Sequence, residues 1–357
     1  MDRAGIETSI LSWDTGGVPE SVVKEVVRQK PDLTCSFHPL PKQHDGHYFW
    51  DTLQIHHWSI LVDPAFYDLE LMSSRYSIIS CVDRSDCDFL RSYHFQTTFF
   101  FPHAVERELI INADDLSKRP YDVILLGTCY DPDNLRAFWM KNFSSEISAA
   151  LDEAVEMVLS DNKTTFFRAL LQSLALNGID SKEVPFDQLA YYVDSYSRGI
   201  ERLQLIRSIK DAQVHVFGGK CWREEQPIED WSYYLSKQKN VTLHPSVPFS
   251  EALEMMKRSK ICLNSMPFFK NGTHERVFAS LACGALPLTG DNVYMREIFT
   301  EDEDLLFYQF TALDQVNDKI QSYLANDAKR KMLIECGQDK VRKYHTWDCR
   351  TLHDFPL

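Results

Sequence analysis

The sequence predicts an α/β protein with two Rossmann-like domains and a helical insertion. Short apolar runs alternate with helical stretches before residue 118 and again after residue 205, a pattern typical of parallel sheets with helices on both faces. The length of 357 residues favours two domains over one. Residues 133–205 show almost only helical spacing, which indicates an inserted helical block.

The first domain is predicted over residues 1–118. Pro19 suits the first turn of a helix expected at 20–29, where four valines have helical spacing. A second helix is expected around 86–92. The expected strands are the apolar runs 8–13, 32–37, 58–62, 76–82 and 96–102. Because the chain enters this pattern directly at residue 6, we expect the sheet to lack its usual first strand.

The second domain is predicted over residues 119–340, and residues 341–357 are expected to pack back toward the first domain. Its expected strands are 121–127, 213–217, 241–244, 260–264 and 285–289. Its expected helices are 250–258, 275–282, 313–324 and 328–344. Gly178 and Pro185 should divide the inserted block into at least three helices.

Composition and charge narrow the classes of function. The net charge of −14 argues against a nucleic-acid binder, which needs a cationic surface. No run of about 18 apolar residues occurs, so we expect no transmembrane segment, while contact with a membrane surface stays open. The nine cysteines form no CxxC pair and several lie in apolar runs, as reduced thiols of a cytoplasmic protein do.

The segment 267–289 carries the clearest chemistry. It predicts a loop, the beginning of a helix at Glu275, and a new strand after Gly284. A helix N-terminus presents unpaired amides and a positive dipole end, and therefore binds phosphate well. The candidate ligand-binding residues of this loop and first turn are Lys270, Gly272, His274, Glu275 and Arg276. The alternative is a plain helix–strand unit in which Gly284 caps the helix.

Each of these residue types suits a part of that chemistry. Gly272 would let the backbone approach a ligand closely. The guanidinium of Arg276 can neutralise a pyrophosphate, and the carboxylate of Glu275 can accept hydrogen bonds from ribose hydroxyls.

Two further predicted strands end in candidate ligand contacts. Gly218, Gly219 and Lys220 follow the strand 213–217 and could form a phosphate loop, or an ordinary turn with a solvated lysine. Asn264 ends the strand 260–264 at its carboxyl edge, where open α/β sheets bind ligands, although a turn residue there is equally expected.

In the first domain, four histidines and several aromatics cluster between residues 44 and 58. The pair His44 and His47 has metal-ligand spacing, but no cysteine joins the cluster, and we expect no metal site. A histidine or an aspartate in such a cluster can take a proton from a hydroxyl group. We therefore select His47 and Asp63 as candidate catalytic residues; the alternative is that they are ordinary loop residues.

The segment Thr273–Gly284, THERVFASLACG, resembles the donor-binding element of group 1 glycosyltransferases, and more narrowly their spore-maturation-protein-like branch. Other matches occur in the expected order: Phe101–Val105 at the domain-joining strand, Val123–Gly127 at the start of the second domain, and His345-Thr346-Trp347 with Arg350 near the end. Two glutamates typical of many group 1 enzymes are replaced by Asn271 and Ala279.

The resemblance implies a bacterial-type enzyme of the glycosyltransferase-B fold that moves a sugar from a nucleoside-diphosphate sugar to a glycan or protein acceptor. It implies retention at the anomeric carbon and no metal or other cofactor, with Arg276 stabilising the leaving diphosphate. The missing glutamates and the missing first strand leave one alternative open, a non-catalytic nucleotide-sugar or carbohydrate binder on the same fold. A second alternative is another enzyme on this fold, such as a nucleotide-sugar epimerase.

Overall fold

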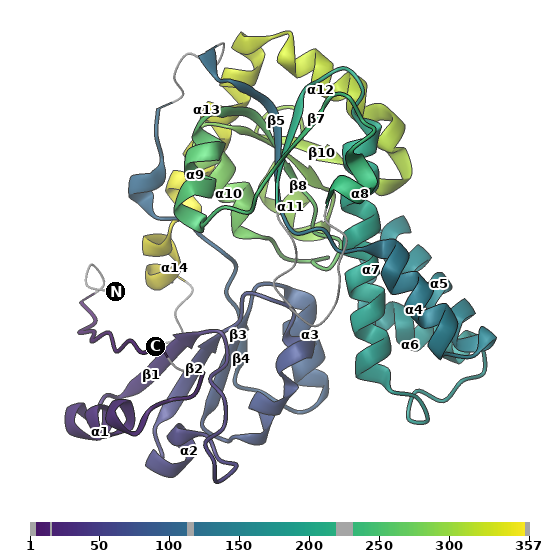
Figure 1. Ribbon diagram of the computed structural model, residues 1–357. Helices are drawn as coiled ribbons and strands as arrows, with labels where there is room; N and C mark the ends of the chain where they lie inside the picture. The colour runs from purple at the N-terminus through teal and green to yellow at the C-terminus, as the bar shows by residue number, and fades with distance from the viewer. Residues whose placement is uncertain (1–4, 15, 113–117, 219–230, 354–357) are drawn as a thin grey trace. The chain divides into compact units, whose positions relative to one another are not determined.

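The computed structural model describes residues 5–14, 16–112, 118–218 and 231–353 (Figure 1). The chain forms two compact units. The first comprises Met1–Ala104, Gly272–His274 and Trp347–Leu357, and the second comprises Val105–Asn271 and Glu275–Thr346. The first segment of the first unit therefore ends at Ala104, ahead of the boundary expected at residue 118.

The first unit contains a parallel four-stranded sheet of order β1-β2-β3-β4. The strands are β1 (Leu33–Phe37), β2 (His56–Ile60), β3 (Ser77–Cys81) and β4 (Thr98–Phe100). The helices are α1 (Glu20–Gln29), α2 (Phe49–Leu53), the 3₁₀ segment η2 (Ala65–Ser73), α3 (Arg84–Ser92) and α14 (Trp347–His353). Strands and helices alternate along the chain, as the sequence pattern predicts.

Apolar side chains cover both faces of this sheet. Trp50 of α2, Leu71 of η2 and Ile79 of β3 belong to one buried cluster. Trp58 of β2 lies in a second cluster, against which Trp347 of α14 packs. Because neighbouring residues of a strand point to opposite faces, β3 supplies both clusters: Ile79 belongs to the first, and Ile78 packs against the second.

The strand expected at residues 8–13 does not form. Residues 6–13 have no regular structure and pair with no strand in the described part of the chain, and Ile10 is 92% exposed. A strand is stable only when its backbone groups find partners on a neighbour, so β-type composition alone was insufficient here.

The second unit contains a parallel six-stranded sheet of order β10-β9-β8-β5-β6-β7. The strands are β5 (Tyr121–Leu126), β6 (Val214–Phe217), β7 (Val241–His244), β8 (Ser259–Asn264), β9 (Leu286–Gly290) and β10 (Leu306–Tyr308). The helices that flank it include α8 (Trp231–Leu235), α9 (Phe249–Lys257), α10 (Glu275–Ala282), α11 (Val293–Ile298), α12 (Val316–Leu324) and α13 (Asp327–Tyr344).

Two neighbouring residues of β8 show how this sheet is covered. Ile261 of β8 lies in the large core cluster with residues of α8 and α12. The next residue, Cys262, points to the other face, where its thiol lies near the hydroxyls of Ser259 and Ser280. Helices therefore cover both faces, in agreement with the predicted architecture.

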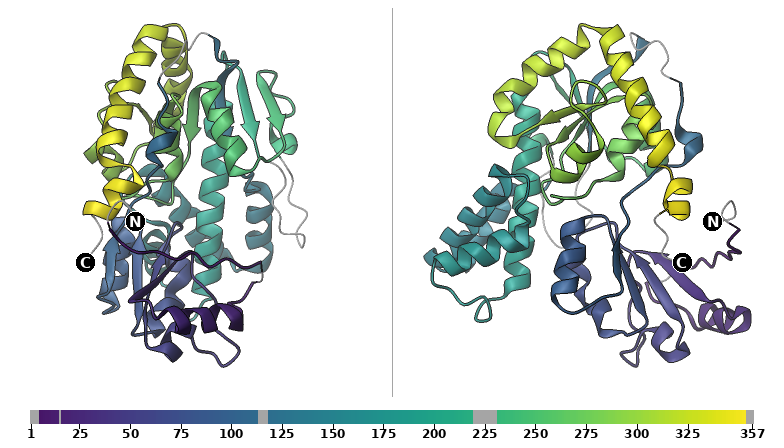
Figure 2. Two further views of the ribbon diagram at one scale, coloured as in Figure 1. Left: turned by 90° about the vertical axis from the view of Figure 1, so that its left-hand side faces the viewer. Right: turned by 180° about the vertical axis from the view of Figure 1, so that it is seen from behind.

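Four helices form the inserted block: α4 (Pro132–Asn142), α5 (Ser145–Ser160), α6 (Phe166–Leu176) and α7 (Phe186–Ser208). They pack side by side in both views (Figure 2). This confirms the predicted helical insertion, with Gly178 and Pro185 lying between α6 and α7. The first half of α7 packs in the block, whereas Leu203 and Ile206 in its second half belong to the core under the sheet. No helix in the described ranges is both long and apolar enough to span a bilayer.

Candidate functional site

The strand order of the second unit creates a crevice at one edge of its sheet. The chain places β6 and β7 on one side of β5, and then β8, β9 and β10 on the other. Where the order reverses, the connections after β5 and β8 leave in opposite directions, and open α/β sheets bind their ligands at this point. The loops after Leu126 and Asn264 therefore form the candidate site.

Two glycines allow close backbone contact at the end of β5. A Cβ at Gly218 would lie 1.9 Å from the carbonyl oxygen of Gly127, which also accepts a hydrogen bond of 3.1 Å from the indole of Trp231. Packing between β5 and β6 thus accounts for Gly218, one of the predicted phosphate-loop residues. Gly219 and Lys220 lie outside the described residues.

Arg276 and Asn264, two of the predicted site residues, meet at this edge. The guanidinium of Arg276, in the first turn of α10, donates a 3.0 Å hydrogen bond to Oδ1 of Asn264. The amide nitrogen of Asn264 in turn donates to the hydroxyl of Thr289, at 2.9 Å. Burial lowers the pKa of Arg276. The pair is therefore held in a defined orientation beside the helix N-terminus.

Helix α7 adds two arginines that the sequence analysis did not select. Arg198 and Arg202 are both buried, one helical turn apart. Arg202 donates a 2.8 Å hydrogen bond to the carbonyl of Thr128, directly after β5. Arg198 forms a salt bridge of 2.7 Å with Asp194 and lies 3.6 Å from the ring centroid of Phe268.

These guanidiniums lie close enough to affect one another. Burial, followed by the neighbouring charges of Arg276 and Arg198, lowers the pKa of Arg202 to about 10, while Tyr130 and Glu201 oppose the shift. Like charges gathered in a region of low dielectric repel each other, and a bound anion relieves that repulsion. We call Arg198, Arg202 and Arg276 the arginine cluster.

The arginine cluster depends on a close contact between α7 and the loop after β5. A Cβ on Gly199 would lie only 2.2 Å from the carbonyl oxygen of Tyr130. Arg198 and Arg202 lie 5.7 and 5.1 Å from the Tyr130 ring centroid. Arginine stacks well on aromatic faces, so Tyr130 orients both guanidiniums.

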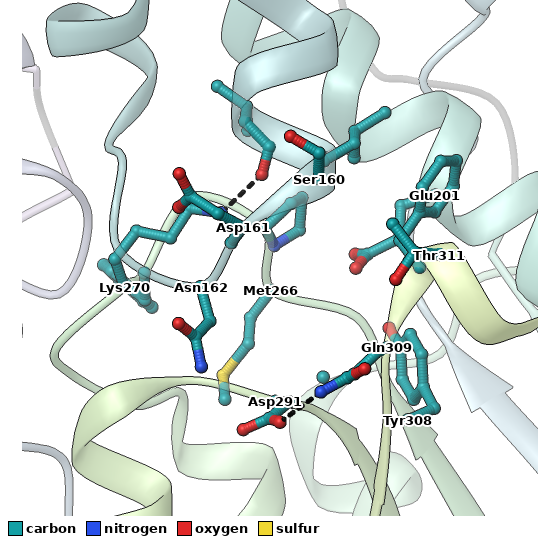
Figure 3. Close-up of a pocket in the computed structure, with 16 residues that line it drawn as sticks. Ser160, Asp161, Asn162, Glu201, Met266, Lys270, Asp291, Tyr308, Gln309 and Thr311 are labelled. Carbon is teal, nitrogen blue, oxygen red and sulfur yellow. Dashed lines mark hydrogen bonds between the residues drawn. The ribbon is translucent and has the colours of Figure 1, made fainter.

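Beside this cluster lies a pocket of about 270 Å³ at the carboxyl ends of β8, β9 and β10 (Figure 3). The end of α5 and the turn of α7 that bears Glu201 complete its wall. Buried Glu201 accepts a 2.5 Å hydrogen bond from Ser265, and burial raises the pKa of its carboxyl group. In Figure 3 its carboxyl group lies near the side chains of Tyr308 and Thr311.

Lys270, predicted to contact a phosphate, is buried at the edge of this pocket. Its ammonium donates hydrogen bonds of 2.6 and 3.0 Å to the carbonyl oxygens of Val158 and Asp161. These carbonyls lie at the end of α5, where the helix leaves acceptors unpaired and its dipole is negative. This contact gives Lys270 a structural role.

The remaining residues of the predicted loop belong to two different units. Glu275 begins α10 in the second unit, whereas Gly272 and His274 group with the first. Gly272 forms an isolated β-bridge with Asp83, and a Cβ at this glycine would lie 2.1 Å from the carbonyl oxygen of Val82. Close backbone packing therefore explains Gly272 without a ligand.

The two candidate catalytic residues of the first unit lie in different segments of the chain. Asp63 is exposed and follows the carboxyl end of β2. His47 precedes α2, whose Trp50 stacks at 4.0 Å on His57 near the amino end of β2. His47 itself lies in a turn where its amide donates to Asp45.

Asp63 instead has a carboxylate neighbour that the sequence analysis missed. Asp68 lies in η2, and burial followed by the negative charge of Asp63 raises its pKa to about 6, against an opposing effect of His38. His38 follows β1 and has a φ of 64°. These three residues form a polar group at the carboxyl edge of the first sheet.

A sequence signal for the arginine cluster exists in retrospect. Arg198 and Arg202 are four residues apart on a buried helical stripe that also holds Asp194, and Gly199 lies between them. Charged residues on a buried helical stripe, next to a glycine, indicate close packing around a polar site.

Residues 201–353 match the model of a protein family described as glycosyl transferase-like. This match begins within α7 and covers the rest of the sheet of the second unit. A comparison with curated proteins found no match.

Solved structures resemble the chain over most of its length. A sucrose-phosphate synthase from Thermosynechococcus elongatus has a TM-score of 0.56 at 11% identity, covering 94% of this chain and 75% of that one. HepE from Anabaena, solved with UDP-glucose, has a TM-score of 0.55 at 8% identity, covering 94% and 82%. A glycosyltransferase from Rickettsia africae has a TM-score of 0.50 at 8% identity, covering 99% and 84%. At these identities the likeness shows the fold, that of glycosyltransferase-B proteins.

Proposed function

We propose that this chain, which has the glycosyltransferase-B fold and whose residues 201–353 belong to the glycosyl transferase-like family, moves a sugar from a nucleoside diphosphate to a glycan or protein acceptor. The observation that carries the proposal is the arginine cluster at the carboxyl edge of the second sheet. That HepE was solved with UDP-glucose, on the same fold, supports a nucleotide-sugar donor.

The arginine cluster supplies what this reaction needs most. As the bond between sugar and diphosphate breaks, negative charge grows on the leaving diphosphate, and fixed positive groups stabilise it without reorganising. Guanidiniums bind phosphate oxygens in pairs of parallel hydrogen bonds. Arg276 and the N-terminus of α10 act together on the diphosphate, and Arg202 approaches from α7. The proposed reaction uses no metal ion or other cofactor.

Asp63 is the proposed residue for the acceptor. It lies at the carboxyl edge of the first sheet, near Asp68, whose pKa of about 6 allows proton exchange near neutral pH. His47, whose imidazole can take a hydroxyl proton, is the second candidate for this step. The proposed reaction retains the configuration at the anomeric carbon, as the resemblance to group 1 glycosyltransferases implies. Proton NMR of the product tests this stereochemistry.

Binding and turnover test this proposal separately. UDP, GDP, UDP-glucose and GDP-mannose are each added to the purified protein, and its melting temperature is measured. A ligand at 100 times its Kd stabilises the folded state by about 2.7 kcal/mol. The Arg202→Met variant should lose that stabilisation, whereas Arg136→Ala, which alters an exposed arginine of α4, should retain it.

Turnover then separates the transferase from its alternatives. Nucleoside diphosphate release that depends on an added glycan or peptide acceptor supports the transferase. If a nucleotide sugar binds but no nucleoside diphosphate is released, whichever acceptor is added, the protein is a non-catalytic binder. Conversion of the donor sugar in the absence of an acceptor indicates an epimerase. Absence of binding by every nucleotide tested would refute the proposal.

A further inference from the structure

The pocket beside the arginine cluster is lined by side chains of mixed hydrogen-bonding character. Its polar groups come from the loop after α5, from α7, and from the ends of β9 and β10; they are Asn162, Glu201, Asp291, Tyr308, Gln309 and Thr311. Its apolar surface includes Met266 and Phe269. Carboxylates accept hydrogen bonds, amides both donate and accept, and hydroxyls do either, so such a lining suits a ligand that carries several hydroxyl groups.

The pocket wall and the arginine cluster share the same stretches of chain. Glu201 precedes Arg202 in α7. The hydroxyl of Tyr308 donates a 3.4 Å hydrogen bond to the carbonyl oxygen of Asn264, whose side chain accepts from Arg276. A group attached to a diphosphate at the arginine cluster can therefore reach the pocket.

The volume of the pocket limits the size of its occupant. Drug-sized ligands fill pockets of about 300–1,000 Å³. A pocket of about 270 Å³ is smaller, and accommodates a single sugar ring better than a whole nucleotide. Both the polar lining and the neighbouring apolar side chains suit a ring with one polar edge and one apolar face.

The charges in the pocket favour an uncharged ring. Burial opposes ionisation of Asp291, but hydrogen bonds from Arg296 and Gln309 hold the pKa of its carboxyl below the usual value. Glu201 adds a second carboxyl group. The ammonium of Lys270 donates to the carbonyls of Val158 and Asp161 at the end of α5. A carboxylate on the ligand would thus face the negative charge of Asp291.

We propose that this pocket receives the sugar ring of the donor, an uncharged hexose held through its hydroxyl groups, and that the inserted helical block thereby helps to select the donor. This inference rests on the proposed function. The assignment of roles is simple: the arginine cluster binds the diphosphate, and Asn162, Asp291 and Gln309 bind the sugar hydroxyls.

Isothermal titration calorimetry with UDP, UDP-glucose and UDP-glucuronate tests the proposal, with GDP and GDP-mannose as a second pair. The wild type should bind UDP-glucose at least tenfold more tightly than UDP-glucuronate. The variants Asn162→Ala and Gln309→Ala should each weaken UDP-glucose binding about two- to tenfold, the effect of one lost hydrogen bond, and leave UDP binding within twofold.

Asn142→Ala is the matched control, because this exposed amide lies in the same helical block but outside the pocket. It should change neither affinity. Thr311→Val, at the exposed rim, serves as a further variant if an amide variant fails to fold.

Two kinds of failure are distinguishable. If the variants weaken UDP and UDP-glucose equally, or weaken neither, or if UDP-glucuronate binds as tightly as UDP-glucose, the pocket is not the sugar site and the inference alone falls. If the wild type binds neither UDP nor GDP, the proposed function falls and the inference falls with it.

Discussion

At the scale of single residues, Arg202 and Arg276 show how the fold concentrates positive charge at one edge of a sheet. Arg202 is buried and anchored on the carbonyl of Thr128, while Arg276 is anchored on Asn264. Each anchor uses one nitrogen of a planar guanidinium, which has five donor hydrogens in a fixed arrangement. Positioning and phosphate binding are therefore compatible in the same side chain.

Replacing Arg276 with alanine should weaken nucleoside diphosphate binding about 10- to 100-fold, because a charged hydrogen bond contributes about 1.5–3 kcal/mol. The melting temperature of the ligand-free protein should change little, since the loss of the hydrogen bond to Asn264 is offset by relief of the repulsion with Arg202. Calorimetric titration and a thermal melt of the same sample check both statements. A large fall in the ligand-free melting temperature would instead assign Arg276 a structural role.

A pH effect is expected from Asp68. Its folded-state pKa of about 6 exceeds the usual value of 3.8, so between about pH 4 and pH 6 the folded protein holds a proton that the unfolded chain has released. The free energy of unfolding therefore falls as pH rises through this interval.

The Asp68→Asn variant has no such proton to lose. It should match the wild type in stability near pH 4 and exceed it above pH 6, by about 1 kcal/mol after allowance for solvent screening. Urea denaturation at a series of pH values measures this difference. A difference that is constant with pH would show that Asp68 does not titrate in this range.

Sequence reasoning found only part of the arginine cluster. Arg276 was recognisable because it begins a helix after a glycine-containing loop, a local signal. Arg198 and Arg202 were not, because their burial results from contacts with Tyr130 and Phe268, which are distant in the sequence. Such contacts exist only once the sheet has formed. The hydrophobic periodicity of α7 therefore predicts an amphipathic helix, but not which of its arginines are buried.

At the scale of elements, α5 is tied to the sheet by one buried ammonium. Lys270, after β8, donates to two carbonyl oxygens at the end of α5. A helix end buried without partners is unfavourable, so this contact fixes where the helix ends and where the loop that bears Asn162 begins. One lysine thus connects the inserted block to the wall of the pocket.

Replacing Lys270 with methionine separates this structural role from phosphate binding. The variant should lose about 1–3 kcal/mol of unfolding free energy, because two buried carbonyls lose their donor. Its affinity for UDP or GDP should remain within a few-fold of the wild type. Denaturation and calorimetric titration measure the two quantities, and the opposite pattern would restore the phosphate-binding role expected from the sequence.

The elements themselves were largely predictable where a continuous apolar run or a helical period is strong. Helix α10 spans Glu275–Ala282, the residues predicted for it, and β7 agrees equally well. The strand predicted at residues 8–13 was wrong for a clear reason. The composition of this segment suits a strand, but a strand forms only beside a neighbouring strand. The sequence of one segment does not show whether such a neighbour is available.

At the scale of the whole molecule, the first unit is discontinuous in sequence. It consists mainly of residues up to Ala104 and is completed by α14, near the other end of the chain. Trp347 of α14 lies 6.1 Å from Phe101 and 5.9 Å from Phe37, between ring centroids. Arg350 donates a 3.0 Å hydrogen bond to the carbonyl of Pro102.

Trp347→Ala should therefore destabilise the first unit selectively, by about 2 kcal/mol for a partly buried aromatic residue. Differential scanning calorimetry should resolve two transitions, only one of which shifts to lower temperature. Tyr344→Ala, an exposed aromatic position in the second unit, serves as the control. Equal displacement of both transitions would mean that the units unfold as one.

Helix α7 has a consequence for how this protein tolerates changes in length. Its 23 residues extend for about 34 Å, and the angular position of every side chain along it is set by the residues before it. Removing one residue between Val193 and Arg198 would rotate the following turn by about 100° relative to the helical block. The guanidiniums would then face away from Tyr130. Natural insertions and deletions should be confined to the loops on either side of α6, because a change of length there does not rotate the side chains of α7.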